Sequence, residues 1–337
     1  MHAGARSVSR VAAVVAGVTI AAGVASGQSA APNSQPNPYR TIQNWSKLPG
    51  RTIGQMATID IDRQGNIWVI ERCGGTSCAD KPDAPAVAFN ASGDLVKSIG
   101  AGIFAQPHGI GIDRDGNIWV TDTQNVPGKG QQVHKFSPDG TLLLSLGTAG
   151  VPGDGPGTFN GPSDVAVAPN GDIFVGDGHG GNTNARIVKF SRDGKFIKTW
   201  GRRGTGPGDF GTPHGLAFDS KGRLFVADRD NNRVQIFNQD GEFLAEWTQF
   251  GRPSGLHIDA NDTLYVADSQ SDGEKQNPPF RRGIRIGSAR DGSVTAFIPF
   301  WNPDPKASAP EGVITDAAGN LYTAGNNFPV VKHVKAK

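Results

Sequence analysis

The chain has 337 residues, and its 33 lysine and arginine residues nearly balance its 31 aspartate and glutamate residues, for a formal net charge of +2. This balance, without any block of basic residues, argues against a nucleic-acid-binding groove. The 47 glycines and 23 prolines recur at intervals among apolar runs, which is typical of a turn-rich β protein and not of a disordered chain.

Residues 1–27 are predicted to be a signal peptide. Arg6 and Arg10 precede the apolar stretch VAAVVAGVTIAAGVA, and small residues follow at 25–27. A charged segment, a short apolar segment and a small-residue cleavage site form an export signal, and an apolar run of about 15 residues is short for a membrane span. An uncleaved anchor is the alternative. Residues 28–40 are expected to be a flexible leader, so we predict a secreted or periplasmic protein that leaves the membrane after cleavage.

The two cysteines, Cys73 and Cys78, lie in ERCGGTSCADK. Their spacing does not match a paired C-x-x-C metal site. An oxidising compartment would let them pair, and the sequence favours a disulfide that closes this local loop.

From about residue 50 onward, a unit of two hairpins recurs six times. The first hairpin reads, for example, GIGIDRDGNIWVTD or GLAFDSKGRLFVAD, and the second reads VHKFSPDGTLLLSLG or VQIFNQDGEFLAEW. Alternating apolar residues around Asp-Gly or Asn-Gly turns are hairpin signals. Unit starts at Pro107, Pro162, Pro213, Pro253 and Pro310 are 40 to 57 residues apart. A four-stranded unit with this period predicts a β-propeller.

The sixth unit has no fourth strand after FPVVKHVKAK, whereas TIQNWSKLP at 41–49 resembles the fourth-strand sequence FLAEWTQFGRP. Pairing of this N-terminal segment with the last unit would remove an exposed sheet edge. We therefore predict an all-β fold over residues 41–337, a six-bladed β-propeller whose ring is closed by an N-terminal strand that completes the last blade.

The start of each innermost strand is expected to line one mouth of the ring near its axis. The residues at this position are, in blade order, Ala57 or Thr58, His108, Ser163, His214, Ser254 and Glu311. His108, His214 and Glu311 lie in alternate blades, about 120° apart in a sixfold ring, so they can converge on the axis. Two histidines and a carboxylate with an open fourth position suit a catalytic zinc ion. The alternative is that each histidine only packs and caps its strand.

The residues just past the second strand of each unit face the same mouth. Arg72 and Arg229 belong to opposite blades, and arginine binds carboxylates bidentately. This predicts a small-molecule or peptide substrate with a carboxylate, although each arginine could instead pair with a neighbouring aspartate. His179, in GDGHGGNTN, could reach inward as a general base or lie on the surface. The other histidines and arginines of the strands are expected to be structural: His134, His257, His333, Arg186 and Arg233.

The six units resemble NHL repeats over nearly the whole mature chain, and the chain resembles the peptidyl-α-hydroxyglycine α-amidating lyase family. The motifs are the PxG strand start, the DxxGNxWVxD hairpin, NNRVQIF and the connection GTGPGDFGTP. The resemblance is best over 159–201 and 213–237 and weaker over 58–120. It implies cleavage of a carbinolamide to a peptide amide and glyoxylate, at a zinc held by three histidines, with arginines and a tyrosine in the site.

Carried over residue by residue, the resemblance makes His108 and His214 zinc ligands, from their PHG context, and Arg72 and Arg229 the site arginines, from WVIER and FVADR. Glu311 stands where the family has a histidine followed by an aspartate. The loss of that aspartate puts the family's structural calcium in doubt.

A second departure from the family is that His179 stands at the position of the tyrosine. We predict a monomeric, exported, zinc-dependent carbon–nitrogen lyase. The predicted metal ligands are His108, His214 and Glu311, and the predicted catalytic residues are Arg72, His179 and Arg229. The alternatives are a non-catalytic propeller that binds a peptide, glycan or protein, and another metal-dependent propeller enzyme such as a lactonase or an antibiotic lyase.

Overall fold

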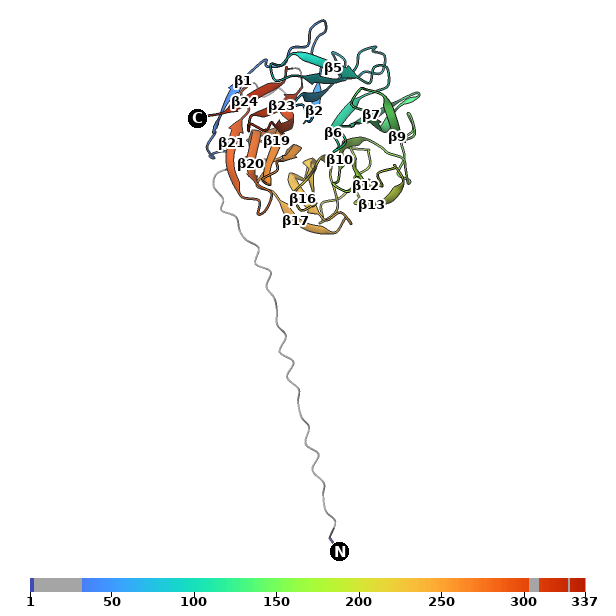
Figure 1. Cartoon of the computed structure of the whole chain (residues 1–337). Coiled ribbons are helices and arrows are strands. Elements are labelled where there is room, and N and C mark those ends of the chain that lie inside the picture. The colour runs from blue at the N-terminus through green and yellow to red at the C-terminus, as the bar shows by residue number, and fades with distance from the viewer. Residues whose placement is uncertain (3–31, 303–308, 327, 337) are drawn as a thin grey trace.

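The computed structural model describes residues 1–2, 32–302, 309–326 and 328–336. Its strands form six four-stranded antiparallel sheets, which are arranged as blades around a central axis (Figure 1). The predicted six-bladed propeller is confirmed. The predicted signal peptide lies almost wholly outside the described residues.

Each of the first five blades uses four consecutive strands, and the first of the four is the innermost. Blades one and two contain β2 (Met56–Ile61), β3 (Ile67–Glu71), β4 (Ala86–Phe89), β5 (Leu95–Ile99), β6 (Pro107–Ile112), β7 (Ile118–Val126), β8 (Lys129–Phe136) and β9 (Leu142–Gly147). Blades three and four contain β10 (Pro162–Val167), β11 (Ile173–Asp177), β12 (Arg186–Phe190), β13 (Phe196–Trp200), β14 (Pro213–Phe218), β15 (Leu224–Asp228), the 3-10 helix η1 (Arg229–Asn231), β16 (Arg233–Phe237) and β17 (Phe243–Trp247). Blades five and six contain β18 (Pro253–Ile258), β19 (Thr263–Asp272), β20 (Arg281–Ser288), β21 (Val294–Pro299), β22 (Pro310–Thr315), β23 (Leu321–Gly325), β24 (Val331–Lys335) and β1 (Tyr39–Ile42).

The DxxGN turn of the first hairpin is fixed by its aspartate. In blade two, Asp113 accepts hydrogen bonds from two backbone N–H groups of the turn and from the indole N–H of Trp119 at 3.0 Å. Gly116 has a φ of +84°, a left-handed conformation that favours glycine. The repeated sequence pattern therefore encodes the turn and ties it to the buried aromatic residue of the next strand.

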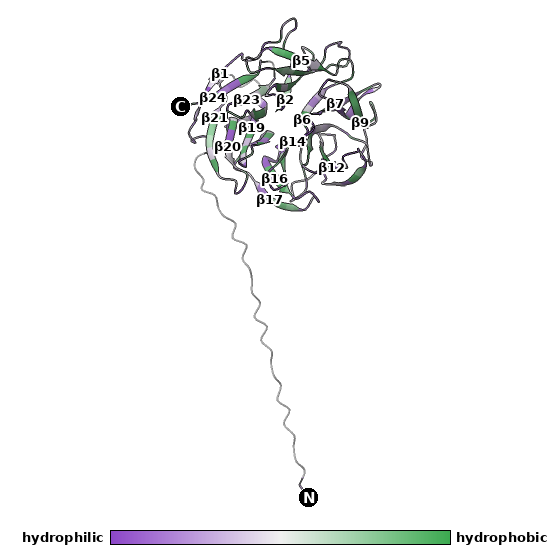
Figure 2. Ribbon diagram, viewed as in Figure 1, coloured by the Kyte–Doolittle hydropathy of each residue, from purple (hydrophilic) through white to green (hydrophobic). Residues whose placement is uncertain are grey.

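The apolar core is divided among the blade interfaces. Among the described residues, one cluster of buried apolar side chains lies between each pair of neighbouring blades. Figure 2 shows the apolar residues spread over the strands around the ring and not gathered at one place. Because each blade buries its two faces against its neighbours, the ring is stable only when it is closed.

The N-terminal strand closes the ring as predicted, but it lies earlier in the chain than the segment 41–49. β1 pairs with β24, with Tyr39 opposite Lys335 and Ile42 opposite Lys332. Two residues that were expected in the flexible leader, Tyr39 and Arg40, therefore belong to the strand. The rest of the predicted segment turns inward, because Asn44 adopts a φ of +54°.

This inward turn places Trp45 in the interface between blades six and one. Its ring centroid lies 4.8 Å from that of Tyr322 and 6.4 Å from that of Phe89. Trp45→Ala should lower the free energy of unfolding by about 3–5 kcal/mol, the usual cost of removing a buried tryptophan, measured by urea denaturation. Trp301→Ala, which removes a tryptophan that is 36% exposed, is the control and should change stability much less.

The three histidines expected to be structural, His134, His257 and His333, have pKa values that burial lowers to about 4. Each therefore binds a proton more readily in the unfolded chain, where the pKa is about 6.5. Above about pH 6.5 the titration of these histidines leaves the free energy of unfolding unchanged. As the pH falls from about 6.5 to about 4, it lowers the free energy of unfolding. As the pH falls through this range, the wild type should lose about 1 kcal/mol more of its free energy of unfolding per pH unit than His134→Gln does. Parallel curves, from urea denaturation at each pH, would contradict this.

The loop between β3 and β4 contains a disulfide between Cys73 and Cys78, with an S–S distance of 2.03 Å, which confirms the predicted pairing.

In the described ranges we find no helix of the length and apolar character needed to cross a membrane.

Candidate metal centre

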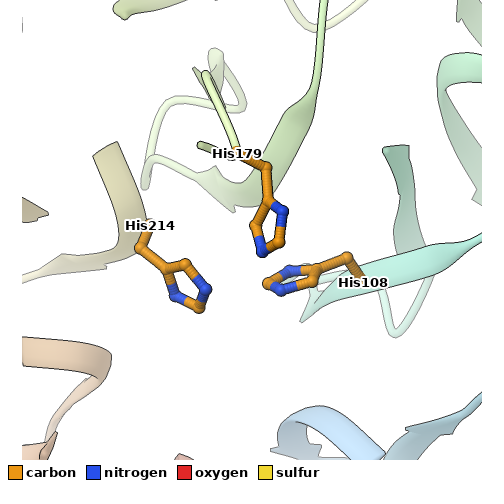
Figure 3. Close-up of side chains that lie close together, drawn as sticks. All are labelled: His108, His179 and His214. Carbon is orange, nitrogen blue, oxygen red and sulfur yellow. The ribbon is translucent and has the colours of Figure 1, made fainter. Parts of the chain in front are cut away.

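The second residue of each innermost strand lies at an irregularity in strand pairing. The register of β6 shifts between Pro107 and Ile110, and that of β14 shifts between Pro213 and Gly215. A β-bulge of this kind re-aims a side chain at the end of a strand. His108 and His214 occupy the two bulges, and their rings turn toward one another (Figure 3).

Each of these two rings is held by the blade that follows it. Nδ1 of His108 lies 2.7 Å from the carbonyl oxygen of Ser163, and Nδ1 of His214 lies 3.0 Å from that of Ser254. A carbonyl oxygen only accepts, so Nδ1 must carry the proton and Nε2 must carry a lone pair. Both residues are fully buried, and neither Nε2 atom has a hydrogen-bond partner among the described residues.

His179 comes from the loop between β11 and β12, two residues after Asp177. Gly178 lets the start of this loop pass close to its end, because a Cβ atom there would lie 2.1 Å from the carbonyl oxygen of Asn184. The His179 ring reaches inward, and its centroid lies 4.3 Å from that of His108 and 5.2 Å from that of His214.

The three imidazoles form the one group of potential metal ligands found among the described residues, with one ligand atom from each residue within 4.8 Å of the others. Burial is the main cause that lowers the pKa of all three, to about 3 in His179 and well below the usual value in His108 and His214. The charge of Arg229 lowers all three pKa values further, and that of Arg72 lowers those of His108 and His179. Three neutral imidazoles, two of them fully buried with unpaired Nε2 atoms, fit a zinc ion, which takes nitrogen ligands in this form.

Glu311, the second residue of β22, lies at the edge of this group and not within it. Its Oε2 is 3.9 Å from Nε2 of His108, and its Oε1 accepts a hydrogen bond from Asn326 at 3.4 Å. The group in the structure thus differs in one member from the predicted ligands, because the blade-three loop brings His179 between blades two and four.

The two predicted arginines line the same mouth but differ in their partners. Arg72 donates from Nε to the carbonyl oxygen of Pro107 at 3.2 Å and from Nη1 to Gln55 at 2.6 Å. Arg229 begins η1 and is 8% exposed, and its Nε has no hydrogen-bond partner among the described residues. Burial lowers the pKa of both arginines, while the charge of Glu311 opposes this.

The aspartates that flank Arg229 are bound to other arginines. Asp228 pairs with Arg233 at 2.9 Å, as Asp177 pairs with Arg186 at 2.8 Å in blade three, so these two strand arginines are structural. Asp230 pairs with Arg252 at 2.5 Å.

Sequence analysis missed Arg252. Its position directly before Pro253 was a usable signal, because the equivalent residues of blades two to four are the uncharged Gln106, Gly161 and Thr212.

Known proteins resemble this chain over part of its length. The NHL repeat family model matches residues 104–126, 159–190 and 210–237. Peptidyl-glycine alpha-amidating monooxygenase of Mus musculus is 44% identical over 163 residues, which cover 45% of this chain and 16% of that protein. Peptidyl-alpha-hydroxyglycine alpha-amidating lyase 1 of Drosophila melanogaster is 32% identical over 224 residues, which cover 58% of this chain and 40% of that protein.

The chain is a six-bladed propeller that contains NHL repeats and is similar to the peptidyl-α-hydroxyglycine α-amidating lyases. It spans less than half the length of either curated relative. A solved gluconolactonase from Xanthomonas campestris has the same fold, with a TM-score of 0.62, 15% identity, and coverage of 91% of this chain and 93% of that chain. The matched NHL segments contain His108, His179, His214 and Arg229, whereas Arg72, Arg252 and Glu311 lie outside them.

Proposed function

We propose that this NHL-repeat propeller is an exported, metal-dependent lyase that cleaves a carbinolamide of the peptidyl-α-hydroxyglycine type into an amide and glyoxylate. The observation that carries the proposal is the group of three neutral imidazoles, two of them with unpaired buried Nε2 atoms, near Arg229, whose Nε has no hydrogen-bond partner among the described residues. The resemblance to the amidating lyases supports the choice of reaction.

His108, His179 and His214 would hold the metal ion, and three protein ligands would leave a fourth coordination position for the substrate. When bound, zinc supplies Lewis-acid polarisation of an oxygen atom. The contacts of Nδ1 with Ser163 and Ser254 orient two of the ligands, as a hydrogen-bond acceptor behind a metal-binding histidine usually does.

The other charged residues would bind the substrate and move its proton. Arg229 and Arg72 would hold the carboxylate, because guanidinium groups bind carboxylates through paired N–H donors. Glu311 would accept the hydroxyl proton as the C–O bond becomes C=O and the C–N bond breaks. It would then return that proton to the amide nitrogen, which leaves with the bonding electrons. This proposal exchanges two roles predicted from the sequence, in which Glu311 was a metal ligand and His179 was the general base.

We propose export to a secreted or periplasmic location on two grounds. The disulfide of Cys73 and Cys78 is of a kind that persists in oxidising compartments, and residues 1–27 have the composition of a signal peptide. The mature protein should begin just after residue 27, and Edman sequencing of its N-terminus tests this.

The function is tested with benzoyl-α-hydroxyglycine as substrate. We expect benzamide and glyoxylate in equal amounts, faster than spontaneous breakdown, with activity lost after dialysis against a chelator and restored by zinc. Hydrolysis of gluconolactone without cleavage of the carbinolamide would indicate a lactonase instead. Stoichiometric metal with neither activity would contradict the proposed reaction.

A further inference from the structure

Arg252 joins the start of blade five to the loop of blade four that contains Arg229. It lies in the connection between β17 and β18 and is 8% exposed. Its Nη1 donates to the carbonyl oxygen of Arg229 at 2.9 Å, its Nη2 donates to Asp230 at 2.5 Å, and its Nε donates to Gln270 at 2.9 Å. These bonds fix both the backbone of η1 and the side chain that follows Arg229.

Asp230 directly follows Arg229, and its charge, after that of Glu311, favours the charged form of this arginine. Its Oδ1 lies 2.5 Å from Nη2 of Arg252 but 4.0 Å from Nε of Arg229. Its Oδ2 accepts a hydrogen bond from Thr212 at 2.5 Å. Both carboxylate oxygens are therefore hydrogen-bonded to residues other than Arg229.

Arg229 remains as a buried cation without a hydrogen-bonded counter-ion in the part of the chain that the structure describes. A buried charge without a hydrogen-bonded partner is costly. Because Arg229 is already desolvated in the folded protein, an anion can bind it without further desolvation of this side chain.

We propose that Arg252 is a positioning residue that holds Asp230 away from Arg229, so that Arg229 is left to bind the carboxylate of the substrate. This inference rests on the proposed function, in which that carboxylate becomes part of glyoxylate. Without Arg252, Asp230 needs only a side-chain rotation to pair with Arg229, and an incoming carboxylate must then compete with it.

Binding of glyoxylate to the purified full chain, measured by isothermal titration calorimetry, tests the inference. Arg252→Met should weaken binding by about tenfold or more, the loss expected when a charge-assisted hydrogen bond must be displaced. Adding Asp230→Asn to Arg252→Met should restore most of the lost affinity, because the competing charge is gone. Arg252→Lys should fall between these, since lysine keeps the charge but bonds fewer acceptors.

Arg223→Met is the matched control. Arg223 also joins blades four and five, with Nε 2.7 Å from Asp219 and Nη2 donating to the carbonyl oxygen of Ala289 at 2.7 Å, but it lies at the opposite face of the ring. It should lower the melting temperature as Arg252→Met does and leave glyoxylate affinity and metal content unchanged.

Two results would overturn the inference: equal glyoxylate affinity in wild type and Arg252→Met, or a loss that Asp230→Asn fails to rescue. A wild-type protein that binds no glyoxylate at millimolar concentration would also overturn it. If the binding pattern holds but benzoyl-α-hydroxyglycine is not cleaved, the proposed reaction is wrong and the role of Arg252 stands.

Discussion

His179→Ala is expected to lose both its zinc and its carbinolamide-cleaving activity, whereas Glu311→Gln is expected to retain about one zinc ion per chain. His179 has a ligand atom within 4.8 Å of those of His108 and His214, and Glu311 lies outside that group. Loss of the metal removes several kcal/mol of transition-state stabilisation, so activity should fall by at least about 10³-fold. Elemental analysis and glyoxylate release measure the two effects.

The control for the histidine variant is His134→Ala, because His134 is also buried but bonds to Ser145 on the neighbouring strand β9 and does not belong to the centre. It should keep its metal. The visible spectrum of the cobalt-substituted protein gives a readout independent of activity, and it should keep a tetrahedral pattern in Glu311→Gln. Zinc lost from Glu311→Gln and kept in His179→Ala would instead support the ligands predicted from the sequence.

Arg229→Met is expected to raise KM for benzoyl-α-hydroxyglycine by about 10- to 100-fold, the cost of losing hydrogen bonds to a charged group. The substrate carboxylate is bound before and during C–N cleavage, so the loss should fall mainly on KM and much less on kcat. Arg229→Lys should recover part of the affinity, because it keeps the charge without the paired N–H donors.

The comparison for this variant is Arg233→Met, four residues along the chain. Arg233 bonds to Asp228 and Glu246 and holds the start of β16, so its loss should lower the melting temperature and leave KM unchanged. An unchanged KM in Arg229→Met would mean that Arg229 does not contact the substrate carboxylate.

The blades could be predicted from the sequence because their determinants act over short distances. Asp113, Gly116 and Trp119 fix one turn within six residues, and the same spacing recurs in other units. The PHG motif likewise marked His108 and His214, because the proline that begins the strand and the glycine after the bulge flank the histidine directly.

The composition of the centre could not be predicted, because it depends on contacts between blades. The prediction of His108, His214 and Glu311 as ligands used only the spacing of strand starts around the ring. It did not include the loop of blade three, in which the close approach of Gly178 to Asn184 helps to bring His179 inward. Arg252 was missed because Arg229 and Asp230, which it holds, belong to the preceding blade. β1 began two residues before the predicted boundary, because pairing with β24 and not a local motif selects the strand.

The pairing of β1 with β24 has a consequence for how the ring responds to force. The two strands are antiparallel, with Tyr39 opposite Lys335 and Ile42 opposite Lys332, so the start of one and the end of the other lie side by side. Tension applied between these two points loads the cross-strand hydrogen bonds one after another and not together. We therefore expect blade six to peel open rung by rung at low tension, and the propeller to begin mechanical unfolding at that seam.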